Sequence, residues 1–125
     1  MRIMINSSSM VPIYEQIVEQ IKSLILNGSL KENDLLPSVR SLSKELKISA
    51  LTVKKAYDYL EEEGMTVTVH GKGTYVAAPN RELMQEEYQK AVESELDAAL
   101  QKGKRYGMDR ESLRQMTELI LDDIF

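Results

Sequence analysis

The sequence predicts a mainly α-helical fold with one small β-hairpin, and three observations support this fold class. Apolar residues recur at helical spacing in five segments of the chain. One stretch, residues 65–77, alternates instead around a glycine-containing turn, which is typical of a hairpin. Serine, glycine and proline stand at the ends of these segments, where such residues cap or stop helices. At 125 residues, of which 42% are hydrophobic, the chain can bury one modest core and carry a helical appendage.

The first helix is expected to begin at Pro12, which suits a first helical turn, and to end at Asn27-Gly28. Its apolar residues form one continuous stripe: Tyr14, Ile17, Val18, Ile21, Leu24 and Ile25. A connector follows, in which Asn33-Asp34 forms a turn and Leu35-Leu36 can add a very short strand.

Two short helices come next, and a serine can cap each of them. Ser38 precedes a helix with an apolar side of Val39, Leu42 and Leu46. Ser49 precedes a second helix, whose apolar side is formed by Val53, Ala56, Tyr57 and Leu60. The connection 47–49 is too short for the two helices to run side by side, so they must cross steeply. This is the geometry of a helix-turn-helix, which presents its second helix outward.

The hairpin follows directly. Met65 to His70 alternates apolar and polar residues, Gly71-Lys72-Gly73 forms the turn, and residues 74–77 form the second strand. The two glycines permit positive φ and let the backbone of the turn approach another molecule closely. Three helices followed by a hairpin make a winged helix.

A boundary is predicted at Pro79, dividing the chain into a winged helix-turn-helix, residues 1–78, and a helical tail, residues 79–125. The tail is expected to hold helices over 81–102 and 109–125, separated by Gly103–Gly107, with Asp109 as the N-cap of the second. Two such helices cannot enclose a core alone, so their apolar stripes need either the first domain or another copy of the chain. A symmetric homodimer is the simplest partner, and its expected interface residues are Leu96, Leu100, Met116 and Ile120.

Composition excludes several classes of protein. There is no cysteine and a single histidine, so neither a disulfide framework nor a Cys/His metal site is expected. No cofactor and no catalytic residues are predicted, because no nucleophile-base grouping or phosphate-binding loop is present. The N-terminal apolar run is too short for a signal peptide and no segment is long enough to span a bilayer, so the default location is cytoplasmic, without membrane contact.

The net charge of −4 is concentrated in the second half of the chain. Residues 1–78 carry nine basic and nine acidic residues, whereas residues 79–125 carry seven and eleven. Between Arg40 and Lys55 there are five basic residues against the single acid Glu45. A local basic face of this kind favours contact with phosphates more than the whole-chain charge suggests.

Several linked motifs stand in order along the first part of the chain: Pro12 to Ile17, Leu36 to Leu42, Thr52 to Tyr57, Leu60 to Gly64, and His70 to Val76. Together they resemble the winged-helix domain of GntR-family bacterial transcription regulators, over roughly residues 11–78. The short tail resembles that of the YtrA-like subfamily, in which it serves dimerisation and is too small for an effector-binding domain.

This resemblance implies a sequence-specific regulator of transcription, not an enzyme, that binds operator DNA. It implies that Arg40 grips the DNA backbone or a base edge, that Thr52 and Lys54 face the major groove, and that the wing tip enters the minor groove or contacts its phosphates. Ala50 and Leu51 depart from the polar residues common among relatives, so contact with a thymine methyl group is an alternative there. The full set of expected DNA-binding residues is Ser38, Arg40, Ser49, Ala50, Leu51, Thr52, Lys54, His70, Gly71 and Lys72.

The expected activity is repression at a palindromic operator by a homodimer, in this family often of a neighbouring transporter operon, with no effector ligand. The alternative is a winged-helix module that binds proteins and does not bind specific DNA. The negative net charge would suit a basic protein partner of such a module. The affinity of a DNA-binding protein for DNA should depend steeply on salt and on DNA sequence, whereas a protein-binding module should show neither dependence.

Overall fold

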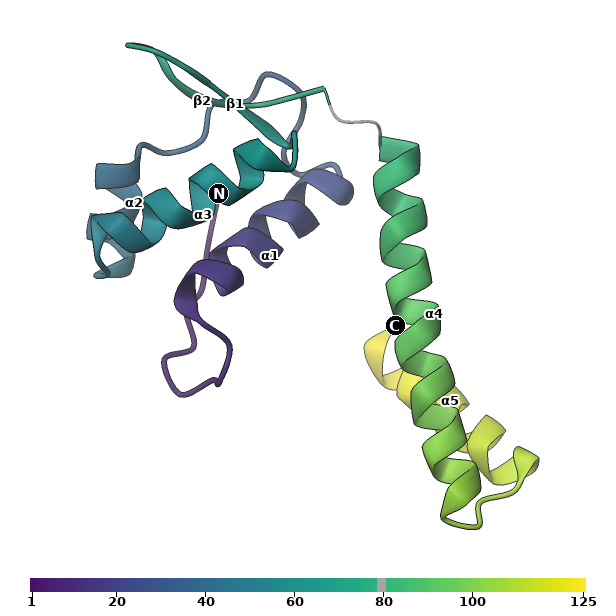
Figure 1. The fold of residues 1–125 in the computed structure, drawn as a ribbon. Helices are drawn as coiled ribbons and strands as arrows, with labels where there is room; N and C mark the ends of the chain where they lie inside the picture. Colours follow the sequence, from purple (N-terminus) through teal and green to yellow (C-terminus); the bar gives the residue numbers. More distant parts are fainter. Residues whose placement is uncertain (79–80) are drawn as a thin grey trace. The chain divides into compact units, whose positions relative to one another are not determined.

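The computed structural model describes residues 1–78 and 81–125, excluding the side chains of Arg81 and Leu83. The predicted boundary residue Pro79 therefore lies outside the described part. The chain forms two compact units, Met1–Arg81 and Glu82–Phe125 (Figure 1). The first holds α1 (Ile13–Leu26), α2 (Val39–Leu46), α3 (Ala50–Glu62), β1 (Thr66–Val69) and β2 (Gly73–Val76); the tail is formed by α4 (Arg81–Arg105) and α5 (Arg110–Ile124). The predicted fold class, mainly helical with a small hairpin, is confirmed.

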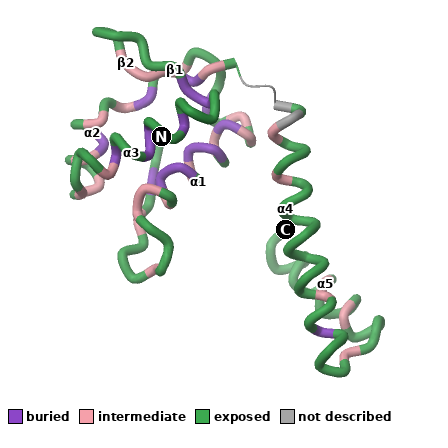
Figure 2. The backbone as a smooth tube through the Cα atoms, in the orientation of Figure 1, coloured by how far each residue is buried: buried purple, intermediate pink, exposed green. Residues whose placement is uncertain are grey.

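The core of the first unit lies between α1 and α3, with one side of α2 against it (Figure 2). The predicted stripes face this core, because each amphipathic helix turns its apolar side inward; Tyr14, Leu24, Val39 and Leu46 are only half-buried. The buried side chains of these helices include Ile17, Val18, Ile21 and Ile25 of α1, Leu42 of α2, and Val53, Ala56, Tyr57 and Leu60 of α3. The Tyr57 hydroxyl donates to the Pro37 carbonyl at 2.7 Å and so ties α3 to the start of α2.

Two features of this core were not predicted. Lys22 is buried in the stripe of α1, where its ammonium pairs with Glu63 at 2.9 Å. The N-terminal segment runs beside α1, since the Met4 amide donates to Gln20 and the Asn6 amide to Gln16, each at 2.9 Å. Ile3 is thereby buried against the core.

Both predicted serine caps are present. Ser38 Oγ accepts from the Ser41 amide at 3.0 Å, and Ser49 Oγ accepts from the Leu51 amide at 3.1 Å. Between the helices Lys47 adopts the left-handed conformation, with φ 56°, which ends α2 and redirects the chain within two residues. The sharp helix-turn-helix connection is therefore formed by local backbone geometry and two caps.

The hairpin strands pair antiparallel, with Thr66 opposite Val76 and Val69 opposite Gly73. Leu35 bridges to Tyr75 on the other side of β2, so the predicted short strand is reduced to a bridge. The alternation in β1 does not produce a buried apolar face. Met65 and Thr66 are both buried, whereas Val67 and Val69 are exposed, because only the base of the hairpin lies over the helices.

In the tail, α4 continues three residues beyond the predicted end at Lys102. Gly103 does not separate the helices as expected; it lies inside the last turn of α4 and is buried. A Cβ at Gly103 would lie 2.6 Å from Leu113 Cδ2, so glycine permits close approach of α5. The turn is made by Tyr106 and Gly107, and Asp109 caps α5 as predicted, accepting from the Ser112 amide at 2.8 Å.

Candidate nucleic-acid interface

Helix α3 buries one side and exposes the other, and the predicted base-reading residues lie on its exposed side. Ser49, Ala50 and Leu51 are exposed at its N-terminus, and Thr52 is half-buried. Leu51 is 77% exposed, so its side chain is available for contact with a partner. The amides of Leu51, Thr52 and Val53 in this first turn are bonded to Ser49, so the turn offers a phosphate mainly the positive end of the helix dipole.

Two lysines of α3 are held by neighbours that the sequence analysis did not single out. Lys54 Nζ pairs with Asp58 one turn later at 2.8 Å, and both side chains are more than half exposed. Lys55 Nζ lies 4.1 Å from the centre of the Tyr14 ring of α1. The i,i+4 spacing of Lys54 and Asp58 could have revealed the first contact. The second depends on the packing of α1 against α3 and has no local signal.

Arg40 lies in the first turn of α2, directly after the Ser38 cap, and is exposed together with that serine. Its guanidinium offers five N–H donors in a planar fork, which suits a phosphate or the acceptor edge of guanine. The helix-turn-helix thus combines one exposed arginine from α2 with the exposed N-terminal turn of α3.

The wing tip is formed by His70, Gly71 and Lys72, all exposed. The Lys72 amide closes the turn on the Val69 carbonyl at 2.9 Å, and Gly71 has φ 77°. Gly73 has φ 130°, and a Cβ there would lie 2.9 Å from Leu35 Cδ1. Both glycines are therefore required by geometry. The tip carries one lysine and no acid, consistent with approach to a polyanion.

Other kinds of site find no support in the described part of the chain. Its His, Asp and Glu residues form no group of three that could hold a metal ion. Among the described helices, none is both long and apolar enough to cross a membrane.

Comparison with known proteins decides the family. Residues 13–76 match the model of the bacterial regulatory proteins of the gntR family. The chain is 35% identical, over 122 residues, to the HTH-type transcriptional repressor YtrA of Bacillus subtilis (strain 168), covering 98% of this chain and 94% of that protein. The chain belongs to the GntR family. The match along the full length also confirms the resemblance to its YtrA-like members.

Solved structures of GntR-type regulators agree with this assignment. A transcriptional regulator from Oenococcus oeni superposes with a TM-score of 0.75 at 30% identity, covering 94% of this chain and 97% of the other. The DNA-binding domain of AraR, solved in complex with operator ORX1, superposes with a TM-score of 0.55 at 29% identity, covering 61% of this chain and 95% of that domain. This GntR-family chain is a DNA-binding regulator of transcription, and the prediction that it is not an enzyme is confirmed by the relatives.

Proposed function

We propose that this GntR-family protein is a cytoplasmic repressor that binds a palindromic operator as a homodimer. The observation that carries the proposal is the exposed N-terminal turn of α3, in the same helix-turn-helix as the exposed Arg40 of α2. Such a turn in a helix-turn-helix is the part that enters the major groove. Two copies related by a twofold axis would engage two half-sites, which is why the operator should be palindromic.

Each exposed residue has a role in this proposal that follows from its chemistry. Arg40 and Lys54 donate to base edges or phosphates, and Ser38, Ser49 and Thr52 donate hydroxyl hydrogen bonds. Ala50 and Leu51 contact thymine methyl groups. Lys54 exchanges its ion pair with Asp58 for a contact with DNA. The wing residues His70, Gly71 and Lys72 approach the minor groove.

The division of labour follows the predicted domains, with 1–78 binding DNA and 79–125 forming the dimer. Support comes from the exposure of apolar tail residues: Leu96 is 47% exposed, Met116 44% and Ile120 53%, while Leu100 is half-exposed. These four residues form the proposed dimer interface. Apolar side chains of this kind are stabilised when a second copy removes them from water.

The regulated genes are proposed to be a neighbouring transporter operon, without control by an effector ligand. The tail does hold an open groove of about 630 Å³ between α4 and α5. The polar side chains of Tyr88, Arg105 and Tyr106, which could serve a ligand site between subunits, do not line this groove. Its mainly apolar lining is suited to a partner subunit.

The test begins by selecting the preferred DNA sequence from a random pool and measuring its affinity at several salt concentrations. Arg40→Ala is expected to cost about 1–3 kcal/mol and to relax preference at one base pair if Arg40 reads guanine. If it grips phosphate, affinity falls equally for all sequences. Lys90→Ala, the same kind of charge loss in the tail, is the matched control.

If the double variant Arg40→Ala/Lys54→Ala kept its operator affinity, the proposed DNA-binding surface on α2 and α3 would be wrong. Absence of any sequence preference, with weak salt dependence, would favour the protein-binding module instead. A genomic search for an inverted repeat upstream of adjacent transporter genes tests the proposed target.

A further inference from the structure

Lys55 lies on the exposed side of α3 and is held by an aromatic ring. Its ammonium nitrogen stands 4.1 Å from the centre of the Tyr14 ring of α1, while the lysine side chain as a whole stays exposed. The face of a tyrosine ring attracts an ammonium group but does not neutralise it. An ammonium group has three N–H donors, so Lys55 keeps both its charge and the capacity to bind an anion.

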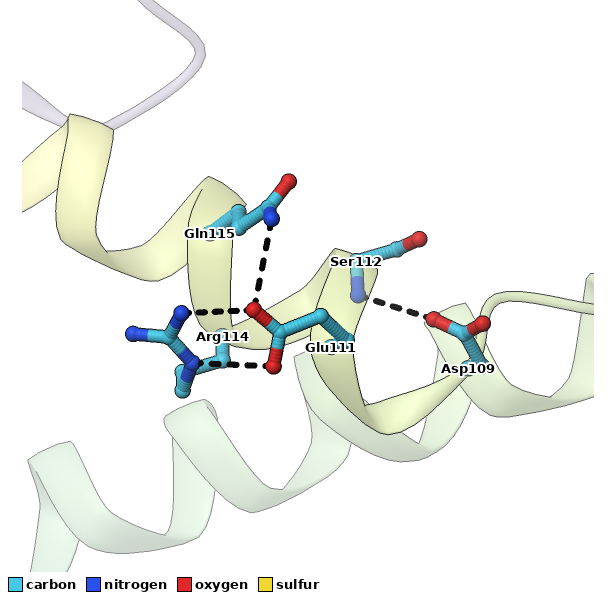
Figure 3. Close-up of polar contacts among 5 residues, drawn as sticks. All are labelled: Asp109, Glu111, Ser112, Arg114 and Gln115. Atoms are coloured by element: carbon cyan, nitrogen blue, oxygen red, sulfur yellow. Dashed lines mark hydrogen bonds and ion pairs between the residues drawn. The ribbon is translucent and has the colours of Figure 1, made fainter.

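Other basic side chains of this protein are held in a different way, by carboxylates. Figure 3 shows Arg114 of α5 bonded to Glu111, through Nη2 at 2.6 Å and Nε at 3.1 Å. On α3 itself, Lys54 pairs with Asp58 at 2.8 Å. A phosphate can bind Lys54 only after this ion pair opens, whereas its binding to Lys55 breaks no ion pair among the described residues. Lys55 is therefore better prepared than Lys54 to bind a phosphate.

The helical repeat determines the direction in which Lys55 extends. Successive residues of an α-helix are turned by about 100°, so Lys54 and Lys55, one turn after Leu51, lie on opposite flanks of that leucine. The flank of Lys54 is the side of α2, because the hydroxyl of Tyr57, one turn further on, binds the backbone at the start of α2. The flank of Lys55 is the side of α1, as its ring contact shows.

The major groove of DNA is about 12 Å wide and is bordered by a phosphate backbone on each side. A recognition helix that lies in the groove therefore presents one flank to each backbone. We infer that Lys55, oriented by Tyr14, is a further DNA-binding residue, which binds a phosphate on the backbone across the groove from α2. The inference rests on the proposed function and adds a contact that the predicted set of DNA-binding residues lacks. Leu51 then faces the base edges between two lysines, one for each strand.

Acidic residues on the same surface limit which part of α3 can approach DNA. An open groove of about 390 Å³ follows the exposed side of α3, and its wall includes Tyr14, Leu51 and both lysines, but also Asp58 and Glu62. Both acids lie in the second half of the helix, about 10 Å or more along the axis from Leu51. Since carboxylates repel a polyanion, phosphate binding is confined to the first half of α3, which enters the major groove with its N-terminus leading.

Tyr14 acts on DNA only through Lys55. The tyrosine is half-buried at the start of α1, and its hydroxyl donates to Glu15 at 3.2 Å, so the fold sets the position of the ring. A lysine that is already held near its bound position loses less conformational entropy when it contacts a phosphate. Tyr14 is therefore a positioning residue, and Lys55 is the residue that touches DNA.

The test measures the affinity of the full chain for its operator and for unrelated duplex DNA over a range of salt concentrations. Lys55→Ala should weaken binding to both DNAs alike, by about threefold to tenfold at moderate salt. It should also lower the slope of log affinity against log salt by about 1, as the loss of one phosphate contact requires. Lys31→Ala, at an exposed lysine beyond the other end of α1, is the matched control and should change neither quantity.

Variants of Tyr14 separate positioning from packing. Tyr14→Phe keeps the ring face and should leave the affinity for DNA within about twofold of wild type, whereas Tyr14→Leu removes the ring and should weaken binding. In a Lys55→Ala background, Tyr14→Leu should have no further effect, because the residue through which it acts is gone. An equal loss of affinity in both backgrounds would show that Tyr14 only supports the fold, and would contradict its positioning role.

Single methylphosphonate linkages, which are uncharged, locate the contact on the operator. At one position the substitution should weaken binding of wild type but not of Lys55→Ala. This position should lie on the other side of the major groove from any phosphate that Lys54→Ala identifies in the same way. If no such position existed for Lys55→Ala, or if it lay on the strand that Lys54→Ala identifies, the inference would be wrong.

Failure of this inference can be distinguished from failure of the proposed function. If Lys55→Ala kept the affinity and the salt slope of Lys31→Ala while wild type still preferred its operator, Lys55 would not bind DNA and the proposed function would stand. A wild-type chain without sequence preference and with weak salt dependence would reject the proposed function and this inference together.

Discussion

The two units of this chain treat their apolar residues in opposite ways. In the winged helix, Ile21 of α1 and Leu60 of α3 are completely buried by their own unit. In the described part of the tail no large apolar side chain is buried, and Ile120 of α5 is 53% exposed. The first unit therefore buries a core of its own, whereas the two tail helices leave their described apolar side chains largely exposed within their own unit.

The comparison predicts that the same substitution has very different effects in the two units. Leu60→Ala should reduce the free energy of unfolding of the winged helix by about 2–5 kcal/mol, because it leaves a cavity in a close-packed core. Leu119→Ala, at a tail position that is 69% exposed, should change the free energy of unfolding by less than about 0.5 kcal/mol. Urea denaturation followed by circular dichroism measures both. Comparable losses of unfolding free energy at the two sites would contradict the difference between the two units.

A smaller loss is expected from Tyr57→Phe. This change removes the 2.7 Å hydrogen bond to the Pro37 carbonyl and leaves the ring in the core, so unfolding should become easier by about 1 kcal/mol. Burial raises the pKa of Tyr57, so the hydroxyl stays protonated and able to donate well above neutral pH. Tyr106→Phe, in an exposed tail residue, is the control and should be neutral. An unchanged stability of Tyr57→Phe would mean that this bond does not hold α3 to α2.

The smallest expected effect is on the stability of the protein at acidic pH. Burial raises the pKa of Glu63, but hydrogen bonds from Lys22 and Tyr59 and the charge of Lys22 outweigh it and lower the pKa below its ordinary 4.5. A carboxyl with a lowered pKa in the folded state contributes stability above its unfolded pKa and loses it as pH falls through the folded value. Wild-type stability should therefore drop more steeply below about pH 4.5 than that of Glu63→Gln. Glu62→Gln, at the neighbouring exposed position, should retain the steeper profile. Identical dependence of stability on pH in Glu63→Gln and wild type would show that the ion pair with Lys22 makes no such contribution.

Much of the winged helix could be predicted because its signals are local. Helical spacing identified the buried sides of α1 and α3, and the two serines identified the starts of α2 and α3. Buried Lys22 was missed because its partner Glu63 follows it by 41 residues, a contact that only tertiary packing creates. The sequence predicts a break between helices at Gly103, because a glycine that ends a helix and one that permits close packing look alike in sequence.

The interface required more than local patterns. Exposure of Arg40 and Leu51 agrees with a binding role, but their assignment to DNA came from the family resemblance and the matched relatives. The Lys54–Asp58 pair has a local signal in its i,i+4 spacing, whereas the contact of Lys55 with Tyr14 depends on the packing of α1 against α3. In the tail, spacing reveals apolar stripes, but spacing alone does not identify the surface that covers them.

The most direct test of the two-unit account is to end the chain at Arg81, the last residue of the first unit, and measure sedimentation and operator binding together. The account predicts a folded monomer whose affinity for the full palindrome falls at least about a hundredfold, while its affinity for one half-site matches that of the full chain at a single half-site. A shortened chain that still sediments as a dimer, or that binds the full palindrome as tightly as the intact protein, would contradict the account.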